Sequence, residues 1–308
     1  MLDTNFNSIL ELLAVFKDEQ TCIDHLTKLR WNGNVISPFD SSSKVYTCKN
    51  NRYKCKNTGL YFNVKTGTLF DNTKVSLRKW FMAIYLITGH SKGISSVQLA
   101  KDIHVTQKTA WFILHRIRNC FGIDDVLEGE VEIDETYVGG KNKNRHKDKK
   151  VEGTQGRSTK DKAAVLGMVQ RGGKVIGKKV DNVKSSTILP EIIGRVKEGS
   201  KVHTDEWTSY RSLQRVYDHS FVKHNEGEYV RGMIHTNTIE GFWSLFKRQI
   251  FGIHHFTSKK HLQKYVDESA FRYNLRQGNV QLRFNEMLSN TEHRLRYQDL
   301  IINEEKTR

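Results

Sequence analysis

The chain has 308 residues, 37% hydrophobic and 27% charged, a composition that excludes a disordered protein and indicates two domains or one domain with an appended module. Lysine and arginine outnumber aspartate and glutamate by 50 to 34, and the net charge of +16 favours a nucleic acid partner, although an AT-rich genome would also enrich lysine. No apolar run reaches the ~18 residues that cross a bilayer, and residues 1–19 lack the pattern of a secretion signal, so we expect no membrane association.

The first part of the chain predicts a mostly helical head with a small β module inside it. Apolar residues at helical spacing predict one or two amphipathic helices over residues 6–30 and another over 76–90. Between them, short alternating runs among serine, asparagine and glycine predict β hairpins over 32–70. The expected divisions are N-terminal helices at 1–31, the β module at 32–73, a helix-turn-helix region at 74–122, a catalytic domain at 123–280 and a C-terminal tail at 281–308.

Residues 94–119 have the pattern of a helix-turn-helix. Ser95 and Thr106 are suited to cap its two helices, because a side-chain oxygen can accept a hydrogen bond from the exposed N–H groups of the first turn. The second helix of such a motif lies in the DNA major groove. An ordinary helical hairpin fits the same pattern. On the DNA-binding interpretation, the side chains expected to project outward are Gln107, Lys108, His115 and Arg118.

From residue 129 the pattern predicts strands and helices that alternate. A mixed sheet flanked by helices, an α/β fold, accounts for this order. The run 139–162 is rich in lysine, and we interpret Lys141, Lys143 and Arg145 as contacts to the DNA backbone or as a solvated charge run. The expected strands are 131–134, 163–169, 174–180, 202–205 and 221–222, and the expected helices are 185–198, capped by Ser185 or Ser186, 208–216, 237–251 and 257–275.

Three acidic residues occupy positions where they could meet. Asp134 and Asp205 each end a predicted strand, and Glu240 lies early in the helix 237–251. Carboxylate oxygens are the ligands that Mg2+ prefers, and two such ions can promote an in-line displacement at phosphorus. Taken by itself, Glu240 is equally typical of an exposed acid that the helix dipole favours near a helix start.

The motifs around these acids carry a family resemblance. The sequences VEIDETYVGGK at 131–141, VHTDEWTSY at 202–210 and HTNTIEGFWSLFKR at 235–248 resemble the three motifs of insertion-sequence transposases with DDE-type active sites, the ISXO2-like family related to the Merlin elements. Asp205 and Glu240 are separated by 34 residues, a spacing typical of that group. Similarity continues through GTLF at 67–70, RKW at 78–80, TQKTAW at 106–111 and FRYN at 271–274.

The resemblance implies an RNase H-like catalytic domain that cleaves DNA at terminal inverted repeats and transfers the strand into target DNA. It implies two Mg2+ ions, which Mn2+ could replace, held by Asp134, Asp205 and Glu240. It further implies that the protein acts on double-stranded DNA as a homo-oligomer on paired ends. The expected location is the bacterial cytoplasm and nucleoid, or the nucleus of a eukaryote. DNA contacts are expected from Asn237, Lys247 and Arg248.

The β module departs from the family pattern. Relatives carry two C-x-x-C pairs that form a zinc ribbon, but here the corresponding positions read SPFD at 37–40 and CKNT at 55–58. Cys48 and Cys55 are two thiols, whereas a structural zinc ion needs about four nitrogen or sulfur ligands. We therefore expect a degenerate module without zinc. The four scattered cysteines favour free thiols in a reducing compartment.

Two other functions compete with an active transposase. A catalytically inactive or domesticated relative would bind DNA through 94–119 without cutting it, although its acidic motifs are intact. Another RNase H-like nuclease, specific for branched DNA, would also need the three carboxylates, but the helix-turn-helix pattern disfavours it.

Overall fold

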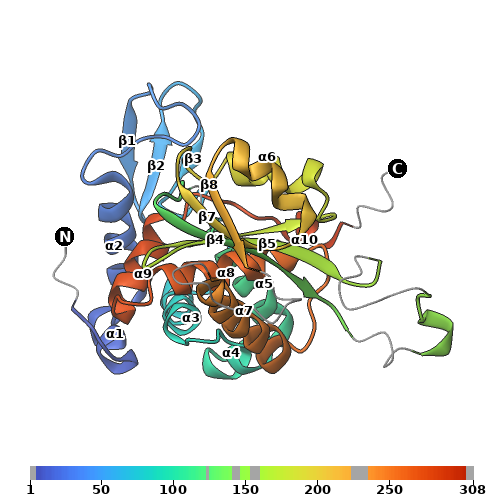
Figure 1. Cartoon of the computed structure of the whole chain (residues 1–308). Coiled ribbons are helices and arrows are strands. Elements are labelled where there is room, and N and C mark those ends of the chain that lie inside the picture. The colour runs from blue at the N-terminus through green and yellow to red at the C-terminus, as the bar shows by residue number, and fades with distance from the viewer. Residues whose placement is uncertain (1–4, 123–124, 141–145, 153–159, 223–234, 303–308) are drawn as a thin grey trace. The chain divides into compact units, whose positions relative to one another are not determined.

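The computed structural model describes residues 5–122, 125–140, 146–152, 160–222 and 235–302 (Figure 1). It divides into two compact units, one made of Met1–Phe121 with Gln277–Arg308 and the other of Gly122–Arg276. The stretch 281–308, expected to be a tail, instead belongs to the first unit. It contains apolar side chains that are buried there, among them Phe284, Met287 and Leu288.

The first unit is built from helices around an aromatic core. The ring of Phe284 lies 5.2 Å from that of Phe6 and 5.5 Å from that of Phe81, so the two ends of the chain share one core. Phe16 joins the same cluster, 4.7 Å from Phe81. The helices of this unit are α1 (Ile9–Val15), α2 (Glu19–Trp31), α3 (Leu77–Gly89), α4 (Ser96–Asp102), α5 (Gln107–Arg118), α9 (Val280–Ser289) and α10 (Tyr297–Ile301).

The predicted helix-turn-helix region contains α4 and α5. Ser95 and Thr106 cap the two helices as predicted, their side-chain oxygens accepting from the backbone N–H of Gln98 and Thr109. His104, in the turn, adopts a left-handed conformation with φ of 51°. The two helices therefore start where the sequence indicates, and whether they read DNA remains a prediction.

The β module is a three-stranded antiparallel sheet of β1 (Val45–Cys48), β2 (Arg52–Cys55) and β3 (Tyr61–Phe62). Cys55 is fully buried. Burial opposes ionisation of its thiol, but hydrogen bonds from Ser37, Ser43 and Thr58 outweigh that effect and lower the pKa to about 6. Two of these hydroxyls, Ser37 and Thr58, come from the degenerate C-x-x-C positions, so side-chain hydroxyls surround the one remaining sulfur.

The second unit is organised around a mixed five-stranded sheet in the order β6-β5-β4-β7-β8. The first three strands in sequence pair as antiparallel neighbours, whereas β7 and β8 run parallel to β4. This topology fits the RNase H-like architecture expected from the sequence. The strands are β4 (Glu130–Val138), β5 (Ala163–Gln170), β6 (Val175–Val180), β7 (Lys201–Asp205) and β8 (Asp218–Val222).

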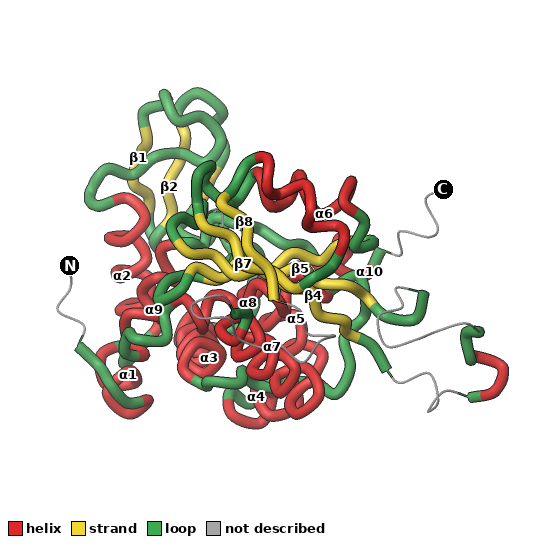
Figure 2. The backbone as a smooth tube through the Cα atoms, viewed as in Figure 1, coloured by secondary structure: helices red, strands yellow, loops and turns green. Residues whose placement is uncertain are grey.

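Helices cover both faces of this sheet (Figures 1 and 2). On one face, α6 (Ser185–Ile193) and the 3-10 helix η3 (Thr208–Arg215) pack on side chains that include Ile133 and Leu166. On the other face lie α7 (Asn237–Gln249), the π-helix η5 (Ile250–His254) and α8 (Leu262–Asn274).

The predicted helix 185–198 needs two corrections. Ser185 and Ser186 lie inside α6 rather than capping it, and Lys184 occupies the cap position. The helix also ends at Ile193, because Val196 forms a β-bridge with Leu127 and so leaves the helical path.

Two glycines allow the helices of the second face to approach the sheet. A Cβ atom at Gly167 on β5 would lie 2.4 Å from the indole of Trp243, and one at Gly177 on β6 would lie 2.3 Å from Val266. Such distances are far inside van der Waals contact, so only glycine fits under these two side chains. The position of Trp243 matters for the acidic residues described below.

The four cysteines, all of which are described, are free thiols. Within the described part of the chain, no helix combines the length and apolar character that crossing a membrane requires.

Candidate active site

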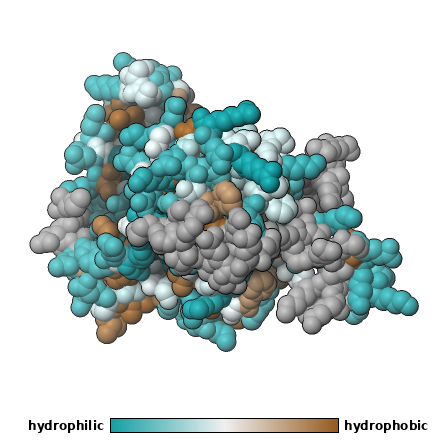
Figure 3. Space-filling model, in the orientation of Figure 1, coloured by the Kyte–Doolittle hydropathy of each residue, from teal (hydrophilic) through white to brown (hydrophobic). Residues whose placement is uncertain are grey.

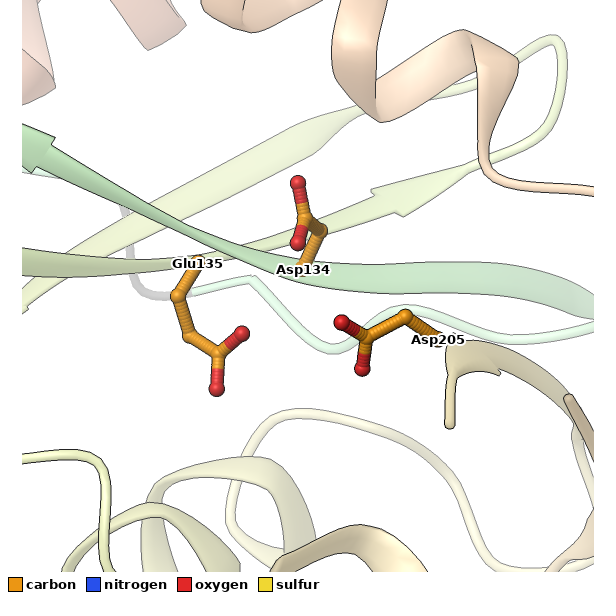
Figure 4. Close-up of side chains that lie close together, drawn as sticks. All are labelled: Asp134, Glu135 and Asp205. Carbon is orange, nitrogen blue, oxygen red and sulfur yellow. The ribbon is translucent and has the colours of Figure 1, made fainter. Parts of the chain in front are cut away.

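Two of the predicted acids lie where the pairing of two neighbouring parallel strands ends. Asp205 ends β7 as predicted, but Asp134 does not end its strand, because β4 continues to Val138 in its pairing with β5. β4 and β7 pair from Glu130 with Lys201 to Glu132 with His203, and the same register would set Asp134 level with Asp205. The side chains of Asp134, Glu135 and Asp205 approach one another there, with one oxygen of each within 4.8 Å of the others. Figure 4 shows Asp134 and Glu135 leaving β4 on opposite sides, with Asp205 directed between them.

The carboxyl of Asp134 is held in place from α7. The indole N–H of Trp243 donates to its Oδ2 at 3.1 Å, and Gly167, the cross-strand neighbour of Asp134, leaves room for the indole ring. Burial, the largest cause, and the negative charges of Asp205 and Glu240 together raise the pKa of Asp134 to about 7, against the opposing hydrogen bonds. The negative charges of Asp205 and Glu240 therefore oppose the ionisation of Asp134.

Asp205 is positioned by its own strand end. It is buried, and its Oδ1 accepts the backbone N–H of Trp207 at 3.0 Å. Since the strand β7 ends at this residue, its carboxyl lies at the end of the strand and points toward Asp134 and Glu135 on β4.

Glu135 reaches the same place from the opposite side of β4. Its neighbour there is Tyr210, a buried residue whose hydroxyl pKa is raised well above its ordinary value by burial and by the charges of Glu135, Asp134 and Asp205. The sequence alone did not single out Glu135, because adjacent residues of a strand normally face opposite ways. Because β7 ends at Asp205, the carboxyl of Asp205 can lie close to side chains from both faces of β4.

Glu132 anchors the start of α7. This fully buried carboxylate accepts the backbone N–H groups of Thr238 and Ile239 at 2.8 and 3.0 Å, and the Thr238 hydroxyl at 2.8 Å. Arg171 donates to it through Nε at 2.7 Å. The ring of His235 also lies beside it, with Nδ1 3.2 Å from Oε1 but without the alignment of a hydrogen bond. A strand residue two positions before Asp134 thus fixes the helix that carries Glu240.

Glu240 lies in the first turn of α7 and is exposed. Its Oε1 accepts the hydroxyl of Thr236 at 3.2 Å. It is not one of the three residues whose oxygens meet, although its charge contributes to the raised pKa of Asp134. The structure therefore brings Asp134 and Asp205 together and leaves Glu240 nearby on the helix.

The donor set suits a hard divalent cation. Carboxylate oxygens are the preferred ligands of Mg2+, which also keeps several waters and so needs few protein ligands. Like charges at one place raise each other's pKa, and a bound cation removes that repulsion. The raised pKa of Asp134 follows from the same arrangement of burial and neighbouring charges, which a bound cation would offset.

Comparison with known proteins identifies the family. The family model of the ISXO2-like transposase domain matches residues 126–274, which include Asp134, Asp205 and Glu240. A protein in the transposable element ISH50 of Halobacterium salinarum, itself uncharacterized, is 32% identical over 270 residues, covering 82% of this chain and 90% of the relative. The chain belongs to the ISXO2-like transposase family.

Two other proteins are less similar to this chain. An uncharacterized transposase-like protein of Haemophilus influenzae is 32% identical over 96 residues, which cover 31% of this chain and 76% of that protein. A chain from the simian T-cell lymphotropic virus intasome in complex with the PP2A regulatory subunit B56 gamma covers 56% of this chain and 67% of its own length at 14% identity. Its TM-score of 0.29 is too low to establish a shared fold.

The side chains predicted to contact DNA differ in their exposure to solvent. Gln107 and Lys108 are exposed at the start of α5, with Lys108 5.2 Å above the ring of Tyr297. His115 and Arg118 do not project outward as predicted, because both side chains are buried. The helical pattern of α5 placed them beside Trp111 and Leu114, and tertiary packing buries this whole part of the helix.

The remaining predicted DNA contacts lie on α7 and in the lysine-rich run that follows β4. Asn237 is exposed at the first position of α7, and Lys247 and Arg248 are exposed in its last turn. Lys141, Lys143 and Arg145 lie outside the described residues.

Proposed function

We propose that the chain is a DNA transposase that cuts element ends at terminal inverted repeats and joins them to target DNA. Hydrolysis of a phosphodiester bond at each end would release a 3′-hydroxyl, which would then attack a phosphodiester bond of the target. The observation that carries the proposal is the meeting of Asp134, inside β4, with Asp205, at the end of β7, with their oxygens within 4.8 Å of one another.

Asp134, Asp205 and Glu240 are the residues proposed to hold two Mg2+ ions. When bound, such ions supply activation of the attacking oxygen and stabilisation of the leaving oxygen in the displacement. Glu135 is a fourth candidate, which its position in the cluster adds to the set expected from the sequence.

The chain's own residues orient this set. Trp243 fixes one oxygen of Asp134, and the Trp207 N–H fixes one of Asp205. Glu132 is proposed as a positioning residue, because its bonds to Thr238 and Ile239 set the start of the helix on which Glu240 lies. Holding ligands in one geometry before the substrate arrives lowers the cost of reaching the transition state.

The test is end cleavage of a duplex that carries the terminal repeat of the element. Asp134→Asn, Asp205→Asn and Glu240→Gln should each reduce Mg2+-dependent cleavage below detection while DNA binding persists. Asp125→Asn is the matched control, because Asp125 pairs with Lys174 at the surface of the same unit. Cleavage that persists in Asp205→Asn would refute the assignment.

Comparison of Glu240→Gln with Glu135→Gln separates the two candidates for the third ligand. The proposal expects Glu240→Gln to abolish cleavage and Glu135→Gln to retain a measurable rate. The reverse order would transfer the third position to Glu135.

A further inference from the structure

The β module has one face that nothing in the described part of its unit covers. Strand pairing places Tyr46 opposite Lys54 and Lys54 opposite Tyr61, so these three side chains form a row across the sheet. Arg52 precedes Lys54 by two residues and so lies on the same face. The row is named here the outer row: Tyr46, Lys54 and Tyr61 with the flanking Lys44 and Arg52.

The opposite face of this sheet is its core. Tyr53 and Phe62 are the alternate residues of β2 and β3, and their rings lie 5.2 and 6.1 Å from that of Trp31. By contrast, Tyr46 and Tyr61 on the outer row are 43% and 50% exposed. Figure 3 shows the tip of the module, at the upper left, in teal and white, the colours of hydrophilic residues and of residues with intermediate hydropathy. The fold of the module therefore does not need the outer row as core.

The cations of the outer row lie on its aromatic rings. Arg52 lies 4.7 Å and Lys54 lies 5.5 Å from the ring centre of Tyr61, and Lys44 lies 5.6 Å from that of Tyr46. No described carboxylate forms an ion pair with Lys44, Arg52 or Lys54 in this structure. Cation–π contacts hold these groups in place without neutralising their charge.

The charge of the surrounding segment has one sign. Residues 41–70 contain no aspartate or glutamate, and the basic residues in this segment are Lys44, Lys49, Arg52, Lys54, Lys56 and Lys65. A surface of exposed tyrosines and unneutralised cations, with no acid in the segment, complements a polyanion with regularly spaced charges.

We propose that the outer row binds the sugar–phosphate backbone of duplex DNA. Lys44, Arg52 and Lys54 would contact phosphates, and the exposed rings of Tyr46 and Tyr61 would pack on sugars. Contacts of this kind fix the orientation of a protein on a duplex without reading its sequence. This inference rests on the proposed function and gives the β module a role that does not require a zinc ion.

The test is the salt dependence of duplex binding by the full chain, measured by fluorescence anisotropy. Each phosphate contact contributes ~0.9 to the slope of log K against log salt concentration, so Arg52→Gln with Lys54→Gln should reduce the slope by about 1.8. The loss of affinity should be the same for a terminal-repeat duplex and an unrelated duplex. Glutamine removes the charge and keeps a polar side chain, and circular dichroism checks that the module stays folded.

Lys17→Gln with Lys28→Gln is the matched control, because it removes two exposed positive charges from the same unit outside the outer row. A slope unchanged by the outer-row variant, or reduced equally by the control, would overturn the inference and leave the proposed function standing. A wild-type chain that binds no duplex at any salt concentration would contradict both. Binding of an acidic protein in place of DNA would likewise overturn it.

Discussion

At the scale of single residues, Asp134 depends most strongly on its surroundings. Its ordinary pKa is 3.8, but burial and the neighbouring charges of Asp205 and Glu240 raise the pKa to about 7. Between about pH 4 and pH 7, Asp134 therefore keeps its proton in the folded protein without metal, whereas the unfolded chain has already released it. Since the folded state binds more protons across this window, the free energy of unfolding falls as the pH rises through it.

A bound cation would replace that proton, which gives a prediction about pH. The apparent affinity for Mg2+ should be about tenfold weaker at pH 6 than at pH 8, because the ion must displace the proton of Asp134 at the lower pH. Thermal unfolding against Mg2+ concentration at the two pH values measures this difference. If the Mg2+ concentration that gives half of the full stabilisation is the same at pH 6 and pH 8, Asp134 does not bind the ion.

At the scale of elements, the buried carboxylate of Glu132 joins β4 to the start of α7. Glu132→Ala would leave the Nε of Arg171 and two backbone N–H groups without their acceptor, and we predict a loss of about 3–5 kcal/mol in the free energy of unfolding. Denaturant titration measures it. Glu128→Ala, which removes an exposed partner of Lys197, should have a much smaller effect. Similar losses for the two variants would mean that Glu132 does not anchor the helix.

The contact between β5 and α7 gives a second prediction at this scale. Gly167→Ala adds a methyl group 2.4 Å from the Trp243 indole, so the ring must move and its bond to Asp134 must weaken. We expect a loss of about 1–3 kcal/mol, as for other overpacked cores. Gly241→Ala in α7 meets no atom within 4 Å and should be neutral or stabilising. Equal stability of both variants, measured by thermal unfolding, would contradict this packing.

The same elements show how far the sequence predicts the site. The sequence predicts the two strands and the end of β7 at Asp205, because both depend on a local pattern along the chain. The parts that could not be predicted depend on tertiary contacts. Glu132 has the same sequence signal as Asp134, a charge inside an apolar strand, and only the position of Thr238 distinguishes their roles. The burial of His115 likewise comes from packing that its own helix does not encode.

At the scale of the whole molecule, the first unit contains both the beginning and the end of the chain, and the residues between them form the second unit. The sequence predicted an additional tail because α9 is short and its partners in the core lie more than two hundred residues earlier. Its Phe284 nevertheless completes the core that contains Phe6 and Phe81.

Phe284→Ala should therefore destabilise the first unit and spare the second. Removal of a fully buried phenylalanine costs about 3–5 kcal/mol. Hydrogen exchange should lose protection in α1 and α3 while β4 and β5 remain protected. A uniform loss of protection across the five-stranded sheet would contradict the division into two units.

The central claim is that Asp134 and Asp205 hold a divalent cation together. Calorimetric titration of the purified full chain with Mn2+ tests it without any DNA or cleavage. The account predicts saturable binding by the wild-type chain and at least about tenfold weaker binding by Asp205→Asn, with Asp125→Asn unchanged. Equal affinity of the wild type and Asp205→Asn for Mn2+ would contradict it.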